Sequence, residues 1–166
     1  MEKTLMNGAT DIDDPNSVRK VVRVQAPADV AFRVFTEKMG RWWPLATHKI
    51  GKAKAVDAII EPREGGRWFE RGEDGSTCDW GRVLVWDPPS RLVLSWDITA
   101  EWTYSAAIGT EVEVRFFPEG TGTRVELCHR KLDRFGDRAG EMRGIFESPG
   151  GWTGLLQAFV EHAARD

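Results

Sequence analysis

The middle of the chain, residues 54–132, is a series of short apolar–polar alternations separated by turns that contain glycine or proline. In the run RLVLSWDIT, residues 91–99, apolar side chains recur at every second position from Leu92 to Ile98, which is the period of a half-buried strand. Turns as short as PEGTGT, residues 118–123, cannot hold the crossover that parallel neighbours need. The pattern therefore predicts about six consecutive strands in an antiparallel meander.

The two ends of the chain supply one more strand and the helices. Residues 18–26 alternate as a strand, and a short helix follows with Pro27 in its first turn and an end near Gly40. Ser148 and Pro149 are a good helix start, and residues 133–147 before them are expected to be flexible or weakly helical. An amphipathic stripe at helical spacing comes next, formed by Trp152, Leu155, Leu156, Phe159, Val160 and Ala163.

An antiparallel sheet with one apolar face needs a cover, and the C-terminal stripe provides one. The sequence therefore predicts an α+β fold in which a curved antiparallel sheet wraps around a long C-terminal helix, with a short helix pair after the first strand. A cavity between the helix and the sheet is a natural consequence of this arrangement. Residues 17–166 are expected to form this single domain, and the polar, acidic residues 1–16 a flexible tail.

Composition excludes several kinds of partner. The net charge of −3 gives no basic footprint, so no nucleic acid is expected to bind. No apolar run is long enough to span a membrane, and no signal peptide is recognisable. Cys78 and Cys128 are far apart and suggest neither a disulfide framework nor a metal site, so we expect a cytoplasmic protein without a metal or cofactor.

The run RWWP places two adjacent tryptophans, Trp42 and Trp43, just after the short helix. Neighbouring residues of a helical turn point about 100° apart, so both rings rarely enter one core. We expect one ring to pack inward and the other to be half-exposed at the mouth of the cavity. The alternative is that both are core residues without a binding role.

Two histidines are candidates for polar roles. His48 lies in the loop after RWWP, where a solvated or capping histidine is the simpler interpretation. His129 shares the apolar side of its strand with Val125 and Leu127, so it is either a hydrogen-bonded core residue or a polar anchor inside the cavity. No known motif of a hydrolase, nucleotide-binding or metal-dependent enzyme is present, so no catalytic residue is assigned.

The order of these elements resembles the START-like superfamily, also called SRPBCC or Bet v 1-like. Within it the chain is similar to the branch named after the C-terminal domain of the activator of Hsp90 ATPase. The resemblance covers residues 18–164 and rests on VRVQAPADVAFRVFTE, RWWP, EPREGGRWFE, WGRVLVWDPPSRLVLSW and the GW of the last helix. It implies a helix-grip fold around an apolar cavity, in a superfamily of lipid and hormone binders, polyketide cyclases and other enzymes.

From these observations we expect a non-catalytic protein that binds a small apolar or amphipathic molecule in the cavity. The expected ligand-binding residues are Trp42, Trp43, His48, Trp68, Trp80, Trp96, Trp102, His129, Trp152 and Phe159. Two alternatives stay open: a chaperone accessory of the Hsp90-activator type, with a chaperone as partner, or a small cyclase-like or hydrolase-like enzyme that uses a histidine as acid or base.

Overall fold

The computed structural model describes residues 14–165, and residues 1–13 of the expected tail lie outside the described part. Seven strands form one antiparallel sheet in the order β1-β7-β6-β5-β4-β3-β2. The strands are β1 (Val18–Val24), β2 (Ala55–Ile60), β3 (Arg67–Gly72), β4 (Thr77–Asp87), β5 (Arg91–Trp96), β6 (Thr110–Glu119) and β7 (Gly122–Arg130). Strands β2 to β6 each pair with the next strand along the chain, which confirms the predicted meander, and β7 also pairs with β1.

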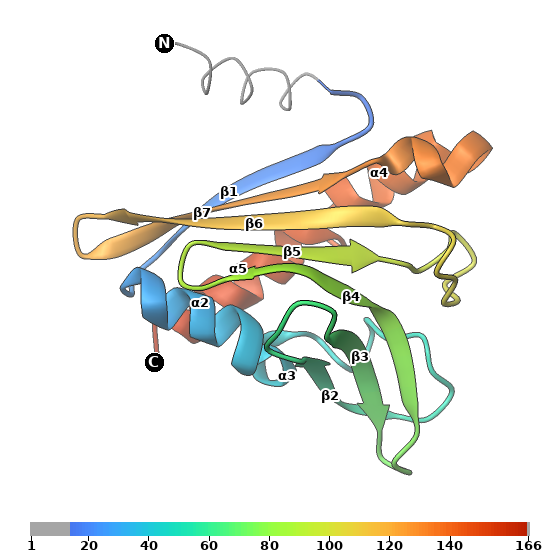
Figure 1. Cartoon of the computed structure of the whole chain (residues 1–166), viewed down its shortest axis with the longest axis horizontal. Helices are drawn as coiled ribbons and strands as arrows, with labels where there is room; N and C mark the ends of the chain where they lie inside the picture. Colours follow the sequence, from blue (N-terminus) through green and yellow to red (C-terminus); the bar gives the residue numbers. More distant parts are fainter. Residues whose placement is uncertain (1–13, 166) are drawn as a thin grey trace.

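The sheet bends along β4. The first half of this strand pairs with β3 and its second half pairs with β5, and the register shifts in both pairings. As a result, β2 and β3 turn away from the other five strands in Figure 1. The bend gives the sheet a concave side.

Helices cover the concave side and one end of the sheet. They are α2 (Ala28–Glu37), α3 (Met39–Trp42), a 3-10 helix η1 (Leu132–Arg138), α4 (Ala139–Glu147) and α5 (Trp152–Ala163). Helix α5 passes behind the sheet in Figure 1 and packs against β1, α2, α3 and α4. Five residues of its predicted stripe are buried: Trp152, Leu155, Leu156, Phe159 and Ala163. The expected α+β arrangement, a curved sheet around a C-terminal helix with a helix pair after the first strand, is confirmed.

The start of the last helix differs from the prediction. Ser148 does not begin α5 but ends α4, since its hydroxyl and its N–H both donate to the carbonyl of Ile145. Helix α5 begins after Gly151, where a Cβ atom would lie 2.3 Å from that same Ile145 oxygen. Only glycine allows α4 and α5 to meet so closely. The preceding segment, expected to be flexible or weakly helical, forms η1 and α4.

Within residues 14–165, no helix is long and apolar enough to cross a membrane.

Candidate functional site

A cavity of about 460 Å³ lies between the sheet, α5 and the connections at one end of the molecule. Its wall comes from the segment after α3, from β4 and β5, from the β5–β6 connection and from the junction of α4 and α5. The lining residues are Trp43, Thr47, His48, Lys49, Ile50, Trp80, Trp96, Ile98, Trp102, Ile145, Phe146, Gly150, Gly151, Trp152 and Leu155. The wall is mostly apolar and aromatic, as is usual for small-molecule sites.

The two tryptophans of RWWP contact each other, with ring centroids 5.7 Å apart, but the rest of their surroundings differ. Trp42 packs in the core against Phe35 and Phe159 and donates a hydrogen bond to the Val34 carbonyl at 3.0 Å. Trp43 lines the cavity, with its ring centroid 5.1 Å from that of Trp80. The expectation that one of them would be half-exposed is wrong, because Trp42 is 4% and Trp43 5% exposed. The rings of β3, β4 and α5 enclose Trp43 on several sides.

Three of the lining tryptophans use their N–H groups inside the protein. Trp43 donates to the His48 carbonyl at 2.9 Å, Trp80 to the Glu70 carboxylate at 2.8 Å and Trp152 to His129 Nδ1 at 3.1 Å. These rings are thereby fixed in orientation and offer a ligand only apolar surface. Trp96 differs, because its Nε1 is buried and has no hydrogen-bond partner among residues 14–165.

Glu70 on β3 holds one wall of the cavity in place. Its side chain is buried, and its carboxylate accepts hydrogen bonds from the N–H groups of Ile50 (2.7 Å) and Gly51 (3.0 Å) as well as from Trp80. Hydrogen bonds from three donors compensate for removing this charge from water. Glu70 therefore ties the segment after α3 to the sheet. The sequence gives no signal for this role, because the segment that Glu70 binds has no periodic pattern.

The polar part of the wall is Thr47, His48 and Lys49. His48 Nε2 lies 2.7 Å from the Gly150 carbonyl oxygen, to which it can only donate, and Nδ1 lies 2.7 Å from the Thr47 hydroxyl. His48 therefore connects the segment after α3 to the turn before α5. Lys49 carries the only permanent charge of the wall, and no carboxylate lies among the described residues that line it.

His129 is a hydrogen-bonded core residue. Because an indole N–H can only donate, Nδ1 accepts from Trp152, and Nε2–H then donates to the Thr110 hydroxyl at 3.0 Å. Thr110 in turn donates to the Trp96 carbonyl at 2.9 Å. Complete burial lowers the pKa of His129 from 6.5 to about 3, so the ring is neutral at pH 7. The residue supports two walls of the cavity and does not line it.

The structure divides the ten expected site residues into two groups. The cavity wall contains Trp43, His48, Trp80, Trp96, Trp102 and Trp152. The surrounding core contains Trp42, Trp68, His129 and Phe159, none of which lines the cavity. Lining residues that were not expected as site residues are Thr47, Lys49, Ile50, Ile98, Ile145, Phe146, Gly150, Gly151 and Leu155. The parity of β5 carries a signal for Ile98, because it alternates with Trp96.

Comparison with known proteins identifies the family. The chain matches the model for activator of Hsp90 ATPase homolog 1-like proteins over residues 25–164. It belongs to this family. No curated protein matches the chain.

Solved structures agree with membership in the activator of Hsp90 ATPase homolog 1-like family. An anthrahydroquino-γ-pyrone synthase, Txn09, is 40% identical, with 87% of this chain and 95% of that chain covered and a TM-score of 0.62. The self-sacrificing resistance protein CalC from Micromonospora echinospora is 29% identical, with 92% and 97% covered and a TM-score of 0.63. Protein NE0264 from Nitrosomonas europaea, at 16% identity, 92% and 97% coverage and a TM-score of 0.65, shows the shared fold alone. The resemblance read from the sequence is confirmed.

Proposed function

We propose that this protein binds a small, flat, polycyclic aromatic molecule in the tryptophan-lined cavity. The observation that carries the proposal is the wall itself. It presents the rings of Trp43, Trp80 and Trp152, whose N–H groups are already bonded inside the protein. Fixed rings with no free donor favour a ligand with extended flat apolar surface over a strongly polar one. The relative with 40% identity is named for forming a fused-ring compound of this kind.

Two features favour a ligand that also carries oxygen. The buried Nε1–H of Trp96 lacks a partner among the described residues, and a ligand carbonyl that reached it would relieve an unpaired donor. Lys49 at the polar part of the wall would attract an acidic hydroxyl or a carboxylate. We therefore expect a ring system with a ketone and at least one acidic hydroxyl group.

Equilibrium dialysis with three probes tests the proposal. Hydroxyxanthone has three fused rings and a γ-pyrone carbonyl, hydroxyfluorene has three fused rings without a carbonyl, and dodecanoate is a flexible chain. We expect dissociation constants to rise in that order, with hydroxyxanthone bound at tens of micromolar or tighter on ligand-efficiency grounds. If dodecanoate bound as tightly as hydroxyxanthone, the cavity would be a general apolar site. If none bound, the proposal would fail.

A ring-closing enzyme is the second candidate, favoured by the 40% identity to a synthase. Among the described histidines, only His48 could then act as the acid or base, because it lines the cavity whereas His129 is fully buried with both nitrogens engaged. Any ring closure found with an acyclic polyketide substrate should fall by a factor of about 100 or more in His48→Gln. Activity retained by this variant would exclude histidine chemistry.

A further inference from the structure

The connection between β5 and β6 contains a tight hairpin turn that carries Trp102. Thr99 N–H donates to the Thr103 carbonyl at 2.8 Å, and Trp102 N–H donates to the Thr99 carbonyl at 2.9 Å. Three residues, 100–102, therefore form the loop. In loops of this length the last residue adopts the left-handed conformation, where glycine is usual.

Trp102 occupies that position with φ 63°. A bulky side chain is strained in this region, because its Cβ crowds the backbone. Elsewhere among the described residues, Lys131 is the only other residue besides glycine with positive φ. The turn could be made at lower energy with glycine, so the needs of the fold do not explain the tryptophan.

The environment of the indole does not explain it either. Trp102 is 42% exposed and lines the cavity. Every other tryptophan has an aromatic neighbour, as in the pairs Phe32–Trp86, Trp42–Trp43, Trp68–Trp80 and Trp96–Trp152. Within the described chain, no aromatic ring packs against Trp102. One large apolar ring is thus held at the edge of the cavity with part of its surface unpaired.

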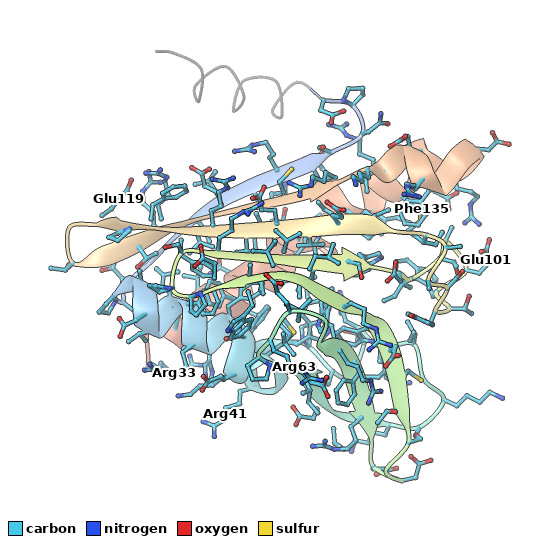
Figure 2. The ribbon with its side chains drawn as sticks, in the orientation of Figure 1. Arg33, Arg41, Arg63, Glu101, Glu119 and Phe135 are labelled. Carbon is cyan, nitrogen blue, oxygen red and sulfur yellow. The ribbon has the colours of Figure 1, made fainter. Side chains whose placement is uncertain are left out.

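The surrounding contacts hold the turn still. The Thr99 hydroxyl accepts from the Thr103 N–H at 3.2 Å and lies 2.8 Å from the Thr103 hydroxyl. Glu101 forms an ion pair with Arg138 at 2.7 Å, which connects the turn to the end of η1. Figure 2 places Glu101 at the same end of the molecule as Phe135 of η1. The backbone that carries Trp102 is therefore held at the edge of the cavity by contacts that need no ligand.

From strain, exposure and position together, we infer that Trp102 is the residue that stacks on the bound ligand and closes the cavity over it. The inference rests on the proposed function and adds to it the residue that determines affinity for flat ligands. The backbone strain and the exposed ring are retained because the ligand, rather than the fold, supplies the missing ring neighbour.

Three variants test this inference by calorimetric titration with hydroxyxanthone and by thermal unfolding. Trp102→Gly suits the left-handed backbone and removes the ring. We expect its melting temperature to equal or exceed that of the wild type and its dissociation constant to rise about tenfold. Trp102→Phe keeps a ring at the same place and should bind within threefold of the wild type. Tyr104→Thr, the control, removes a 38% exposed aromatic side chain of the same connection that does not line the cavity, and should leave binding unchanged.

Any one of three results would overturn the inference. A dissociation constant that rises less than threefold in Trp102→Gly would show that the ring does not hold the ligand. A fall of more than 5 °C in the melting temperature of Trp102→Gly would make Trp102 a structural residue. Equal weakening by Tyr104→Thr would assign the effect to the whole connection. Absence of binding by the wild-type protein is a separate result, because it would remove the proposed function itself.

Discussion

At the scale of single residues, His129 shows how a buried polar group can be fully satisfied and still affect the whole molecule. Its ring accepts from Trp152 and donates to Thr110, so the neutral form fits all its partners. A second proton would have to sit on Nδ1, where it would face the N–H of Trp152. Burial and this clash both favour the neutral ring.

This arrangement makes stability depend on pH. The pKa of His129 is about 3 in the folded protein and about 6.5 in the unfolded chain, so between these values only the unfolded chain binds the proton. Stability should therefore decrease as the pH falls from 6.5 toward 3, by about 1 kcal/mol per pH unit for this group. Urea unfolding of the wild type and of His129→Gln, which cannot titrate, measures the difference. Parallel pH curves for the two proteins would contradict the prediction.

Glu70 is the second residue whose removal should have a specific effect. In Glu70→Gln the amide nitrogen cannot accept a hydrogen bond, so at least one donor among Ile50, Gly51 and Trp80 loses its partner. We expect a loss of about 2 kcal/mol in unfolding free energy and faster hydrogen exchange at the amides of Ile50 and Gly51.

The matched control for Glu70 is Glu73→Gln on the exposed turn after β3, which should change stability by less than about 0.5 kcal/mol. Slow exchange retained at Ile50 and Gly51 in Glu70→Gln would mean that the segment is held by something other than this carboxylate.

At the scale of elements, the bend of β4 depends on one close approach. A Cβ atom at Gly81 would lie 1.8 Å from the Ser95 carbonyl oxygen of β5, a distance that no side chain tolerates without displacing backbone. Gly81 lies where β4 passes from its pairing with β3 to its pairing with β5. Only glycine lets the two strands come so near at the bend.

Gly81→Ala should therefore destabilise the protein by more than about 2 kcal/mol, as overpacking between backbones does. Gly140→Ala is the control, because nothing lies within 4 Å of its added Cβ and the residue belongs to α4. In that helix, alanine should be neutral or stabilise by up to about 1 kcal/mol. Denaturant unfolding measures both variants, and equal stability of the two would show that β4 and β5 can move apart at no cost.

The elements were predictable where a period was present. The alternation of β5 to β7 and the stripe of α5 predicted their existence and their buried faces. For β4, only the existence of a strand was predicted. The start of α5 was misplaced because Ser148 and Pro149 are as suitable after a helix as before one. The start of α5 is determined by the contact of Gly151 with the end of α4. Such a tertiary contact leaves no hydrophobic period in the sequence from which it could be predicted.

The same limit applies to the cavity. Trp96 lies on a strand whose parity points it inward, so its participation was predictable. Trp80 has the same parity as the exposed Leu84, and it reaches the cavity only because the register of β4 shifts at the bend. The segment that contributes Thr47, Lys49 and Ile50 has no period, and its position depends on the distant Glu70. Trp68 belongs to the same aromatic cluster but does not line the cavity, because it packs behind Trp80 and Trp96. No sequence pattern distinguishes a tryptophan that lines the cavity from one that lies behind its wall.

At the scale of the whole molecule, binding in the cavity should stabilise the fold. Hydroxyxanthone at 100 times its dissociation constant should add about 3 kcal/mol by mass action, which raises the melting temperature by roughly 5–10 °C in a protein of this size. Ile145→Trp, which adds volume to the cavity wall, should abolish this shift. Val21→Trp adds the same ring at an exposed position outside the cavity and should keep it. Circular dichroism measures the melting temperatures of both variants. If the ligand raised them equally, it would bind outside this cavity.

The close packing of the tryptophans has an optical consequence. Ring centroids lie 5.1 Å apart for Trp43–Trp80, 5.5 Å for Trp68–Trp80, 5.7 Å for Trp42–Trp43, 5.8 Å for Trp68–Trp96 and 5.9 Å for Trp96–Trp152. At such separations an excited indole passes its energy to the next one before it can emit, so these six rings share the energy of each absorbed photon. A ligand that accepts energy from any one of them quenches all six. Ligand binding should therefore decrease the tryptophan fluorescence of the protein by much more than the quenching of one tryptophan would. Because energy moves between differently oriented rings, the fluorescence should also have low polarisation even in a rigid glass.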